Sequence, residues 1–540
     1  MIDLEIPVGK RTLKYRLFEM LPGAISYGML ILMVVLSLAS PTLAAVYLFI
    51  IIISLLVKAT GIAFQTINGR KRLDRAQEVN WHNRLSDLER PEESYKRLLK
   101  RESQAFGAKQ HLENLRLVSA DPESFPKPSQ IYNAVIIATY NESYDVLAPT
   151  IRSVLASSFS SQKIILTIAY EERGGEAIKN TVLKLEKEFK DNFFAFHLVE
   201  HPDKMPNEVI GKGGNITFAG KFLKGWLKDK KIDSKNVIVT TLDSDNRPHH
   251  TYFDYLTYEY IVHEDRKHLA YQPVCMFMSN IWDVPAPMRV IATGNSFWNI
   301  ISSMRPHTLR NFASHSQSMD ALEEMDFWST RTIVEDGHQY WRSYFYFGGN
   351  YQVMPIYVPI YQDAVLSDTY MKTLKAQFIQ LRRWAYGASD VPYVATRVFS
   401  RDRNVPLIDG IAKLIRLLDG HVTLASVSIL VAVGGWIPVL VNSEASRSLS
   451  ANQLPDIISR IQQVATLGIA VTVFMSFKLL PPRPERYKRS RTWLMVLQWL
   501  LMPFTAIFYN SFAALYSQGR LFLGKYLDKF DVTDKAVVKD

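Results

Sequence analysis

The sequence predicts an α/β domain on a mostly parallel sheet, inserted between N-terminal and C-terminal transmembrane helices. Two observations support this fold class. Apolar segments long enough to cross a bilayer lie near both ends of the 540-residue chain. Between them, short apolar runs alternate with helical patterns, as is typical of strands joined by crossover helices. A chain of this length is also too long for one ordinary soluble core.

Composition narrows the class of protein further. The formal net charge is +11, but the basic residues cluster beside apolar segments, at 10–16, 70–75 and 483–491. This placement indicates a membrane surface, and nucleic acid is not an expected partner. Cys275 is the single cysteine, which excludes an internal disulfide and any multi-cysteine metal site. A domain facing the reducing cytosol is the simplest interpretation, with Cys275 as a packing residue.

Residues 1–68 are predicted to hold a transmembrane hairpin. Its two apolar segments, 24–39 and 43–64, are separated by a Ser-Pro-Thr turn. Basic residues before the first and after the second place both outer ends in the cytoplasm. Because a second apolar segment follows at once, the first is expected to be retained and not cleaved as a signal peptide. Residues 69–130 form a charged helical region that ends in a proline-rich linker.

Residues 131–400 are predicted to form the α/β domain. Its expected strands are the apolar runs at 134–138, 164–169, 194–199 and 237–242. An amphipathic segment follows at 401–420, where a helix would lie on the membrane surface or pack against the soluble domain.

Residues 421–518 are predicted to form the C-terminal transmembrane helices, followed by a tail at 519–540. The candidate spans are 422–441, 461–480 and 493–516. The basic loop between the last two is expected in the cytoplasm, in agreement with the N-terminal hairpin. Pro503 leaves the last segment open between one kinked span and a re-entrant pair, so the side of the tail is undecided.

Two carboxylates one residue apart, Asp243 and Asp245, come directly after the strand predicted at 237–242. Ligands of parallel sheets gather beyond the carboxyl ends of the strands. Two hard oxygen donors there suit Mg²⁺ or Mn²⁺ bridging a diphosphate. An isolated pair of this kind more often caps a helix or builds a turn. Whether this pair binds a metal therefore has to be judged from the other motifs.

Further polar motifs follow the other predicted strands. Lys212 stands in a glycine-rich stretch at an expected helix start, where it could meet a phosphate or a sugar hydroxyl. Gln380, Arg383 and Trp384 share one helical face, which could grip a diphosphate and stack on a sugar, although a solvated arginine and a core tryptophan fit equally well. The remaining polar residues in this set are Thr139, Tyr140, Glu142, Glu171, Glu172, Glu335 and Asp336.

In this order, the motifs ATYNE, KGGN, DSD, VED and QLRRW resemble those of the processive membrane glycosyltransferases of family 2, the cellulose, chitin and hyaluronan synthase group. The resemblance covers about residues 131–390 and the flanking membrane segments. It implies a GT-A-like catalytic domain, a nucleotide-sugar donor (a UDP-sugar by preference), and dependence on Mg²⁺ or Mn²⁺.

The resemblance also implies roles for individual residues. Asp243 and Asp245 would bind the metal, with Asp243 also contacting the donor. Asp336 would be the general base, with Glu335 beside it. Donor diphosphate and acceptor would be contacted by Gln380, Arg383 and Trp384, and the nucleotide by Thr139, Tyr140, Glu142, Glu171, Glu172 and Lys212.

Three departures from the family pattern stand out. Glutamates replace the usual aspartate after the second strand, which puts base recognition in doubt. VED replaces TED but keeps both carboxylates. The acceptor segment reads FASHSQSMDALEEMDFW at 312–328, where His315 could touch a sugar or serve structure.

The expected function is inverting transfer to a growing polysaccharide, with extrusion, by a multi-pass enzyme of the plasma membrane whose catalytic domain is cytosolic. Transfer of one sugar to a lipid-linked acceptor is an alternative, and a non-catalytic nucleotide-sugar-binding scaffold is another. The sequence identifies no sugar, export partner or oligomeric state.

Overall fold

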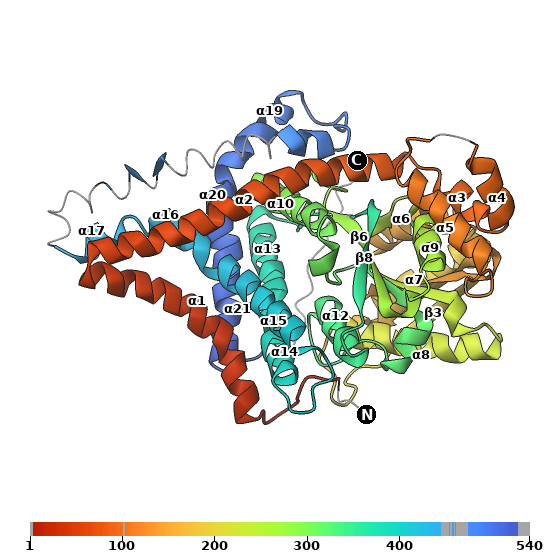
Figure 1. The fold of residues 1–540 in the computed structure, drawn as a ribbon, viewed down its shortest axis with the longest axis horizontal. Coiled ribbons are helices and arrows are strands. Elements are labelled where there is room, and N and C mark those ends of the chain that lie inside the picture. The colour runs from red at the N-terminus through yellow and green to blue at the C-terminus, as the bar shows by residue number, and fades with distance from the viewer. Residues whose placement is uncertain are drawn as a thin grey trace.

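The computed structural model describes residues 4–100, 103–443 and 474–527, with isolated positions between 453 and 460. Helices α1, α15–α17, α20 and α21 gather on one side of the molecule, and the α/β domain lies on the other (Figure 1). Four helical segments of the described chain are long and apolar enough to cross a membrane: Leu13–Ala39, Pro41–Lys58, Leu407–Val433 and Ser490–Phe522.

The N-terminal hairpin consists of α1 (Leu13–Ala39) and α2 (Pro41–Gln77). Ser40 separates them: its backbone N–H donates to Leu36 O, and its side chain accepts from Leu43 N at 3.4 Å. Pro41 then begins α2, at a position that needs no N–H. Helix α2 runs well past the predicted end at 64, so it carries the first part of the predicted helical region into the α/β domain.

The rest of that region forms α3 (Trp81–Asp87), α4 (Pro91–Leu98) and α5 (Ala108–Ala120). Helices α3 and α5 pack on α9 (Tyr252–Val262), and α4 packs on α5. Trp81 stacks on Tyr255 with ring centroids 3.5 Å apart, and His111 Nδ1 lies 2.9 Å from the Tyr258 hydroxyl. The charged helical region therefore forms part of the soluble domain.

One eight-stranded sheet organises the α/β domain, in the order β3-β2-β1-β4-β7-β6-β8-β5. All four predicted strands are confirmed, as β1 (Tyr132–Thr139), β2 (Ile164–Glu171), β3 (Ala195–His201) and β4 (Val237–Asp243). These four run parallel. Alternate residues of β1 enter separate cores on the two faces of the sheet, with Val135 and Ile137 on one and Ala134 and Ile136 on the other.

The second half of the sheet adds antiparallel strands, so the sheet is mixed: four of its seven strand pairings are parallel and three are antiparallel. It contains β5 (Arg247–Pro248), β6 (Leu269–Met276), β7 (Ser316–Ser318) and β8 (Gln352–Tyr361). Strand β7 is antiparallel to β4 and β6, and β5 is antiparallel to β8, while β6 and β8 run parallel. Sequence analysis did not predict these strands.

Helices cover both faces of the sheet and connect its strands. They are α6 (Tyr144–Leu155), α7 (Gly175–Phe189), α8 (Lys212–Asp229), α10 (Ala286–Ser303), α11 (Met319–Glu324) and α12 (Glu335–Tyr346). Helices α13 (Tyr370–Ala385) and α14 (Asp390–Val398) follow the last strand, β8, and pack on other helices.

The amphipathic segment predicted at 401–420 forms the start of a longer helix, and Leu414 and Leu417 on it pack against the α/β domain, which is one of the two predicted arrangements. Helix α15 (Leu407–Val422) continues through a π turn into α16 (Ser428–Val433), and this continuous segment is a candidate span. Helix α17 (Ile437–Val441) follows. Most of the span predicted at 461–480 lies outside the described residues.

The last predicted span forms one helical run, not a re-entrant pair. It contains α19 (Ser490–Leu497), α20 (Met502–Thr505) and α21 (Phe512–Phe522), joined by 3₁₀ and π turns. Pro503 is accommodated in the first turn of α20, where a missing N–H is tolerated. Ser517 of α21 donates to Arg382 O at 2.6 Å, so α13 is fastened to this candidate span.

Candidate active site

Lys212 joins two of the predicted site carboxylates. Its Nζ lies 2.8 Å from Asp243 Oδ1, and 3.2 and 3.1 Å from the two carboxylate oxygens of Asp336. Asp243 ends β4, Lys212 begins α8, and Asp336 lies in the first turn of α12. Three segments far apart in the sequence thus meet at the carboxyl edge of the parallel strands, where ligands of such sheets gather.

The glycine after Lys212, Gly213, allows the start of α8 to lie close to the segment that leads into α12. A Cβ on Gly213 would lie 2.3 Å from Ser329 O and 3.3 Å from Glu335 Cβ. Any larger residue would therefore push the start of α8 away from the segment that leads into α12. Close packing therefore requires a glycine at this position of the KGGN motif, whether or not a ligand binds there.

Buried polar contacts fix α12 itself. His338 Nδ1 lies 2.6 Å from Asp390 Oδ1 in α14, and both side chains are buried. Arg342 is buried and donates to Phe327 O at 2.7 Å and Met325 O at 3.0 Å. Since the helix is held along its length, Glu335 and Asp336 at its N-terminus have a defined position, where the helix dipole favours negative charge.

The neighbouring carboxylates keep the Lys212 side chain positively charged. Burial alone would lower its pKa, but the charges of Asp243, Asp336 and Glu335 outweigh burial and raise it. Lys212 is therefore a permanent cation at neutral pH. In Glu335, burial raises the pKa to about 7, helped by the charge of Asp336 and opposed by Lys212 and Arg383. The two adjacent carboxyls thus differ in environment, because Glu335 is buried and Asp336 is partly exposed.

The raised pKa of Glu335 predicts a pH-dependent stability. Between the ordinary glutamate pKa and about 7, the folded protein holds a proton that the unfolded chain releases. Stability is therefore lost as pH rises through this window, by about 3 kcal/mol. In Glu335→Gln this loss should disappear. Thermal unfolding of the metal-free protein at pH 5 and pH 8 measures it, with the exposed Glu324→Gln as control. Equal pH dependence in Glu335→Gln and wild type would contradict the prediction.

Asp245 and Asp243 are the residues that could hold a divalent cation. Asp245 is buried, and its Oδ2 accepts from Asp363 N at 3.2 Å. No group of three or more His, Cys, Asp or Glu side chains gathers as a metal centre in the described part of the chain. Mg²⁺ commonly binds through one or two carboxylates with substrate phosphates and water. Asp243 and Asp245 supply two such carboxylates, so the donor set suits the cation, and Lys212 is the competing positive charge at Asp243.

The predicted nucleotide residues at the end of β1 form a tight turn. Glu142 Oε2 accepts from the Thr139 hydroxyl at 2.6 Å and from Tyr140 N at 2.8 Å, and Oε1 accepts from the Ser244 hydroxyl at 3.1 Å. Glu142 therefore organises its own turn and ties it to the loop that carries Asp243 and Asp245. Its carboxylate has a structural function in addition to any contact with a donor.

The two glutamates at the end of β2, Glu171 and Glu172, differ in burial and in their hydrogen-bond partners. Glu171 is buried and accepts from Arg173 NH2 at 2.9 Å, and the Arg173 guanidinium lies 4.0 Å from the ring centroid of Tyr140. Glu172 is exposed and accepts from Asp203 N at 2.9 Å. Glu171, Arg173 and Tyr140 thus form one cluster at the strand edge, and Glu172 serves the neighbouring loop.

His315 lies next to the site residue Asp336, and its contacts give it a structural role. Its Nε2 accepts from Trp328 Nε1 at 3.2 Å, and its Nδ1 lies 2.9 Å from Phe312 O. These contacts require the Nδ1–H tautomer, and burial lowers the pKa of the imidazole, so the ring is neutral. Nδ1 lies 3.6 Å from Asp336 Oδ1. The structural interpretation of His315 is therefore the better one.

Helix α13 carries the QLRRW residues and packs against α21 of the last candidate span. Arg383 acts electrostatically on Glu335. Trp384 is 38% exposed and packs on Phe277 with centroids 5.7 Å apart, so it is not a core tryptophan. Gln380 accepts from Gln377 Nε2 at 3.1 Å.

Sequence reasoning missed three contributors to this region: Arg173, which pairs with Glu171, Trp328, which sets the tautomer of His315, and Asp363, whose N–H holds Asp245. Asp363 acts from a segment 118 residues from Asp245, which no spacing signals. Arg173 and Trp328 lie 2 and 13 residues from their partners, but neither belongs to a motif that indicates such a pairing. Cys275 is buried and burial raises the pKa of its thiol to about 12, as expected for a packing residue.

No sequence profile of a known family matches the chain, and no curated protein matches it. Among solved structures, it is similar to the mannosyltransferase PcManGT of Pyrobaculum calidifontis in complex with GDP-Man and Mn²⁺, with 14% identity, a TM-score of 0.38, and coverage of 86% of this chain and 99% of that one. It is also similar to residues 1–349 of TarS of S. aureus in complex with UDP-GlcNAc, with 12% identity, a TM-score of 0.36, and coverage of 75% and 95%. Similarity this low establishes no function, so the functional assignment depends on the site itself.

Proposed function

We propose that this chain is an inverting membrane glycosyltransferase that uses a nucleotide-sugar donor and a divalent cation. The observation that carries the proposal is the meeting of Asp243, Lys212 and Asp336 at the carboxyl edge of the parallel strands, with distances of 2.8 and 3.1 Å from the lysine. This arrangement supplies a carboxylate that can act as a base beside a second carboxylate that can bind a cation.

The reaction requires little from the protein beyond placement and charge. Asp336 accepts the proton of an acceptor hydroxyl as that oxygen forms a bond to the anomeric carbon. The bond from that carbon to the diphosphate breaks, and the nucleotide diphosphate leaves with the bonding electrons. Lys212 and Arg383 offer positive charge near the departing group. The proton on Asp336 then passes to solvent, and no sugar–enzyme bond forms.

Asp243 and Asp245 would hold Mg²⁺ or Mn²⁺. When bound, such an ion supplies positive charge that stabilises a departing diphosphate. The nucleotide is assigned to the turn at Thr139 and Tyr140 and to the Glu171–Arg173 pair. A UDP-sugar is the preferred donor in this proposal.

The acceptor favoured in this proposal is a growing polysaccharide. Helix α13 carries Gln380, Arg383 and Trp384 and is bonded to α21 of the last candidate span through Ser517. An acceptor sugar stacked on the half-exposed Trp384 would therefore lie between the reacting groups and the membrane helices. In this arrangement a growing polysaccharide could leave along the spans of a plasma-membrane protein with a cytosolic catalytic domain.

The experiment that tests the proposal measures release of nucleotide diphosphate together with product size. The purified protein in nanodiscs is incubated with Mg²⁺ or Mn²⁺ and a panel of nucleotide-sugars. Release with a high-mass, glycosidase-sensitive product would support polymer synthesis and identify the sugar. Release only after addition of a lipid acceptor would move the assignment to single-sugar transfer. Donor binding without release from any donor would favour a non-catalytic scaffold.

Replacing Asp245 by asparagine is expected to weaken cation-dependent donor binding by roughly tenfold or more, because a charged oxygen donor becomes neutral. Asparagine keeps an oxygen that can accept from Asp363 N. Titration of the donor with and without Mn²⁺ measures the effect, and binding in the presence of a chelator should be equal in variant and wild type. An unchanged Mn²⁺ dependence would remove Asp245 from the cation site.

A further inference from the structure

Two segments remote from the reacting groups hold the loop that leads into Asp336. The loop is residues 329–334, and α12 begins directly after it. One segment is residues 4–6, before α1, and the other is residues 524–527, after α21. We call the two segments together the clasp. None of its residues takes part in the proposed sugar transfer.

Residues 4–6 hold the start of the loop. The hydroxyl of the buried Ser329 donates to Glu5 Oε2 at 2.7 Å. The other oxygen of the same carboxylate, Oε1, lies 3.1 Å from NH2 of Arg342, a buried residue of α12. One carboxylate thus ties the loop to the helix that carries Asp336.

Residues 524–527 hold the end of the loop. Ile333 is 3% exposed and belongs to a hydrophobic cluster against which Tyr526 and Leu527 pack. Leu527 N also donates to the hydroxyl of Tyr386, directly after α13, at 3.2 Å. The other members of the cluster are Val209, Val334, Ala388 and Leu521. Residues beside the KGGN, VED and QLRRW motifs therefore meet on this part of the clasp.

A glycine turn and a buried ion group fix residues 524–527 in place. Gly524 has a φ of 68°, a left-handed conformation that lets the chain turn after α21. The Tyr526 hydroxyl donates to Glu19 Oε2 at 3.0 Å, and the Arg11 guanidinium lies 3.6 Å from the centroid of the Tyr526 ring. Glu19 is fully buried on α1 and pairs with Arg11. The clasp is therefore anchored on both α1 and α21.

The loop is also joined to the segment that carries Lys212. Val209 N donates to Thr330 O at 2.8 Å, and Gly213 lies against Ser329, where an added Cβ would be 2.3 Å from the carbonyl oxygen. A shift of the loop would therefore displace Lys212 as well as the base that it contacts.

We propose that the clasp positions Asp336 as the general base, and that Leu527 is a positioning residue for the transfer reaction. A base must lie within hydrogen-bond reach of the hydroxyl that it deprotonates, and a displacement of about 1 Å can cost roughly a hundredfold in rate. The cation-binding pair is held from elsewhere, since Asp243 ends β4 and Asp245 accepts from Asp363 N. The effect on the reaction rate rests on the proposed function, whereas the effect on the loop does not.

Hydrogen exchange of the full-length protein in nanodiscs, followed by mass spectrometry, tests whether the clasp holds the loop. In Leu527→Ala the backbone amides of residues 329–336 should exchange roughly tenfold faster or more, because the smaller side chain leaves the cluster underpacked. Leu527→Met, which nearly keeps the volume, should restore slow exchange.

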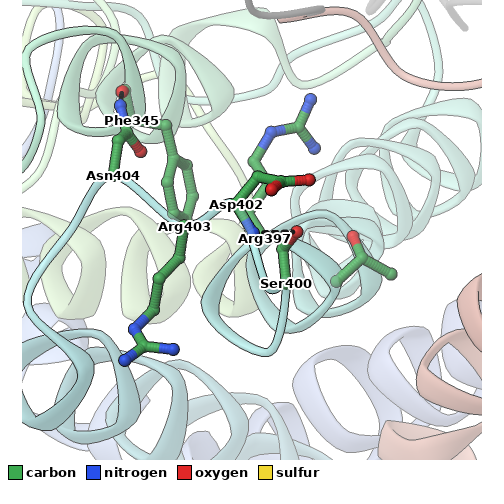
Figure 2. Close-up of a pocket in the computed structure, with 7 residues that line it drawn as sticks. Phe345, Arg397, Ser400, Asp402, Arg403 and Asn404 are labelled. Carbon is green, nitrogen blue, oxygen red and sulfur yellow. Dashed lines mark hydrogen bonds between the residues drawn. The ribbon is translucent and has the colours of Figure 1, made fainter.

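Two controls separate this effect from a general loosening of the protein. Leu523→Ala is matched, because Leu523 is 65% exposed and lies in the same turn after α21. Arg403→Gln alters the other end of α12, where Arg403 and Phe345 line a cavity of about 350 Å³ (Figure 2). Both controls should leave exchange of residues 329–336 unchanged. Equal exchange of this segment in Leu527→Ala and in either control would overturn the proposal.

Turnover and donor affinity test the consequence for the reaction. Leu527→Ala should release nucleotide diphosphate roughly ten- to hundredfold more slowly, with donor affinity within about threefold of the wild type. In the Asp336→Asn background the same change should lower the residual rate by less than about twofold, because residues that act as a unit are not additive. A full further loss in that background would overturn the positioning role. If the wild type transfers no sugar while Leu527→Ala still speeds exchange of the loop, the proposed function fails and the clasp stands.

Discussion

Replacing Asp336 by asparagine is expected to reduce sugar transfer by roughly 10²- to 10⁴-fold, the usual contribution of a general base. Asparagine has nearly the same shape but cannot accept the proton of the acceptor hydroxyl. Donor binding should change little, because Lys212 keeps Asp243 as its partner at 2.8 Å and the cation-binding pair is intact. The variant should therefore bind nucleotide-sugar and fail to release nucleotide diphosphate.

Two measurements separate chemistry from binding in this variant: the rate of nucleotide diphosphate release, and donor affinity by calorimetry. Asp326→Asn is a suitable control, since Asp326 is an exposed aspartate that pairs with Lys221 of α8 at 3.0 Å. That control should retain wild-type turnover. Normal turnover by Asp336→Asn would exclude Asp336 as the base, and loss of both binding and turnover would indicate that the substitution disturbs the whole site.

The sequence pattern predicted the four strands of one half of the sheet but not those of the other half. In the two longer missed strands, β6 and β8, prolines account for the difference. Strands β1, β2 and β4 are nearly unbroken apolar runs, which only a buried strand of this length explains. Strands β6 and β8 contain Pro273, Pro355 and Pro359, which argue against a strand when read locally. Pairing between β6 and β8 shifts register next to Pro273, so the tertiary structure accommodates what local propensity disfavours.

The candidate site was predictable where a residue directly follows a strand, and not where it depends on a distant segment. Asp243 ends β4, so its position at the sheet edge follows from the pattern alone. The contact between Lys212 and Asp336 joins residues 124 positions apart, and nothing in either motif specifies it. Similarly, the motif did not indicate that the Glu142 carboxylate accepts hydrogen bonds within its own turn, whatever its contact with a donor. A motif predicts residue types at a site more readily than it predicts their partners.

Replacing Lys212 by methionine is expected to destabilise the metal-free protein by about 2 kcal/mol at pH 8, since Asp243 and Asp336 lose a buried counter-charge while remaining partly exposed to water. Lys212 is only 9% exposed and contacts Asp243 and Asp336. The raised pKa of Lys212 means that its charge is fully present at this pH. Without it, Asp243, Asp336 and Glu335 would repel one another in a confined space.

Thermal unfolding across pH and cation concentration tests this prediction, with Lys221→Met as control because Lys221 is 50% exposed and lies in the same helix. The control should cost about 1 kcal/mol or less. The deficit of Lys212→Met should narrow as pH falls, because protonation of the carboxyls removes the repulsion, and Mg²⁺ or Mn²⁺ should narrow it at pH 8. A deficit independent of both pH and cation would mean that Lys212 contributes through packing alone, and the site would then lack the charge balance that the proposed chemistry requires.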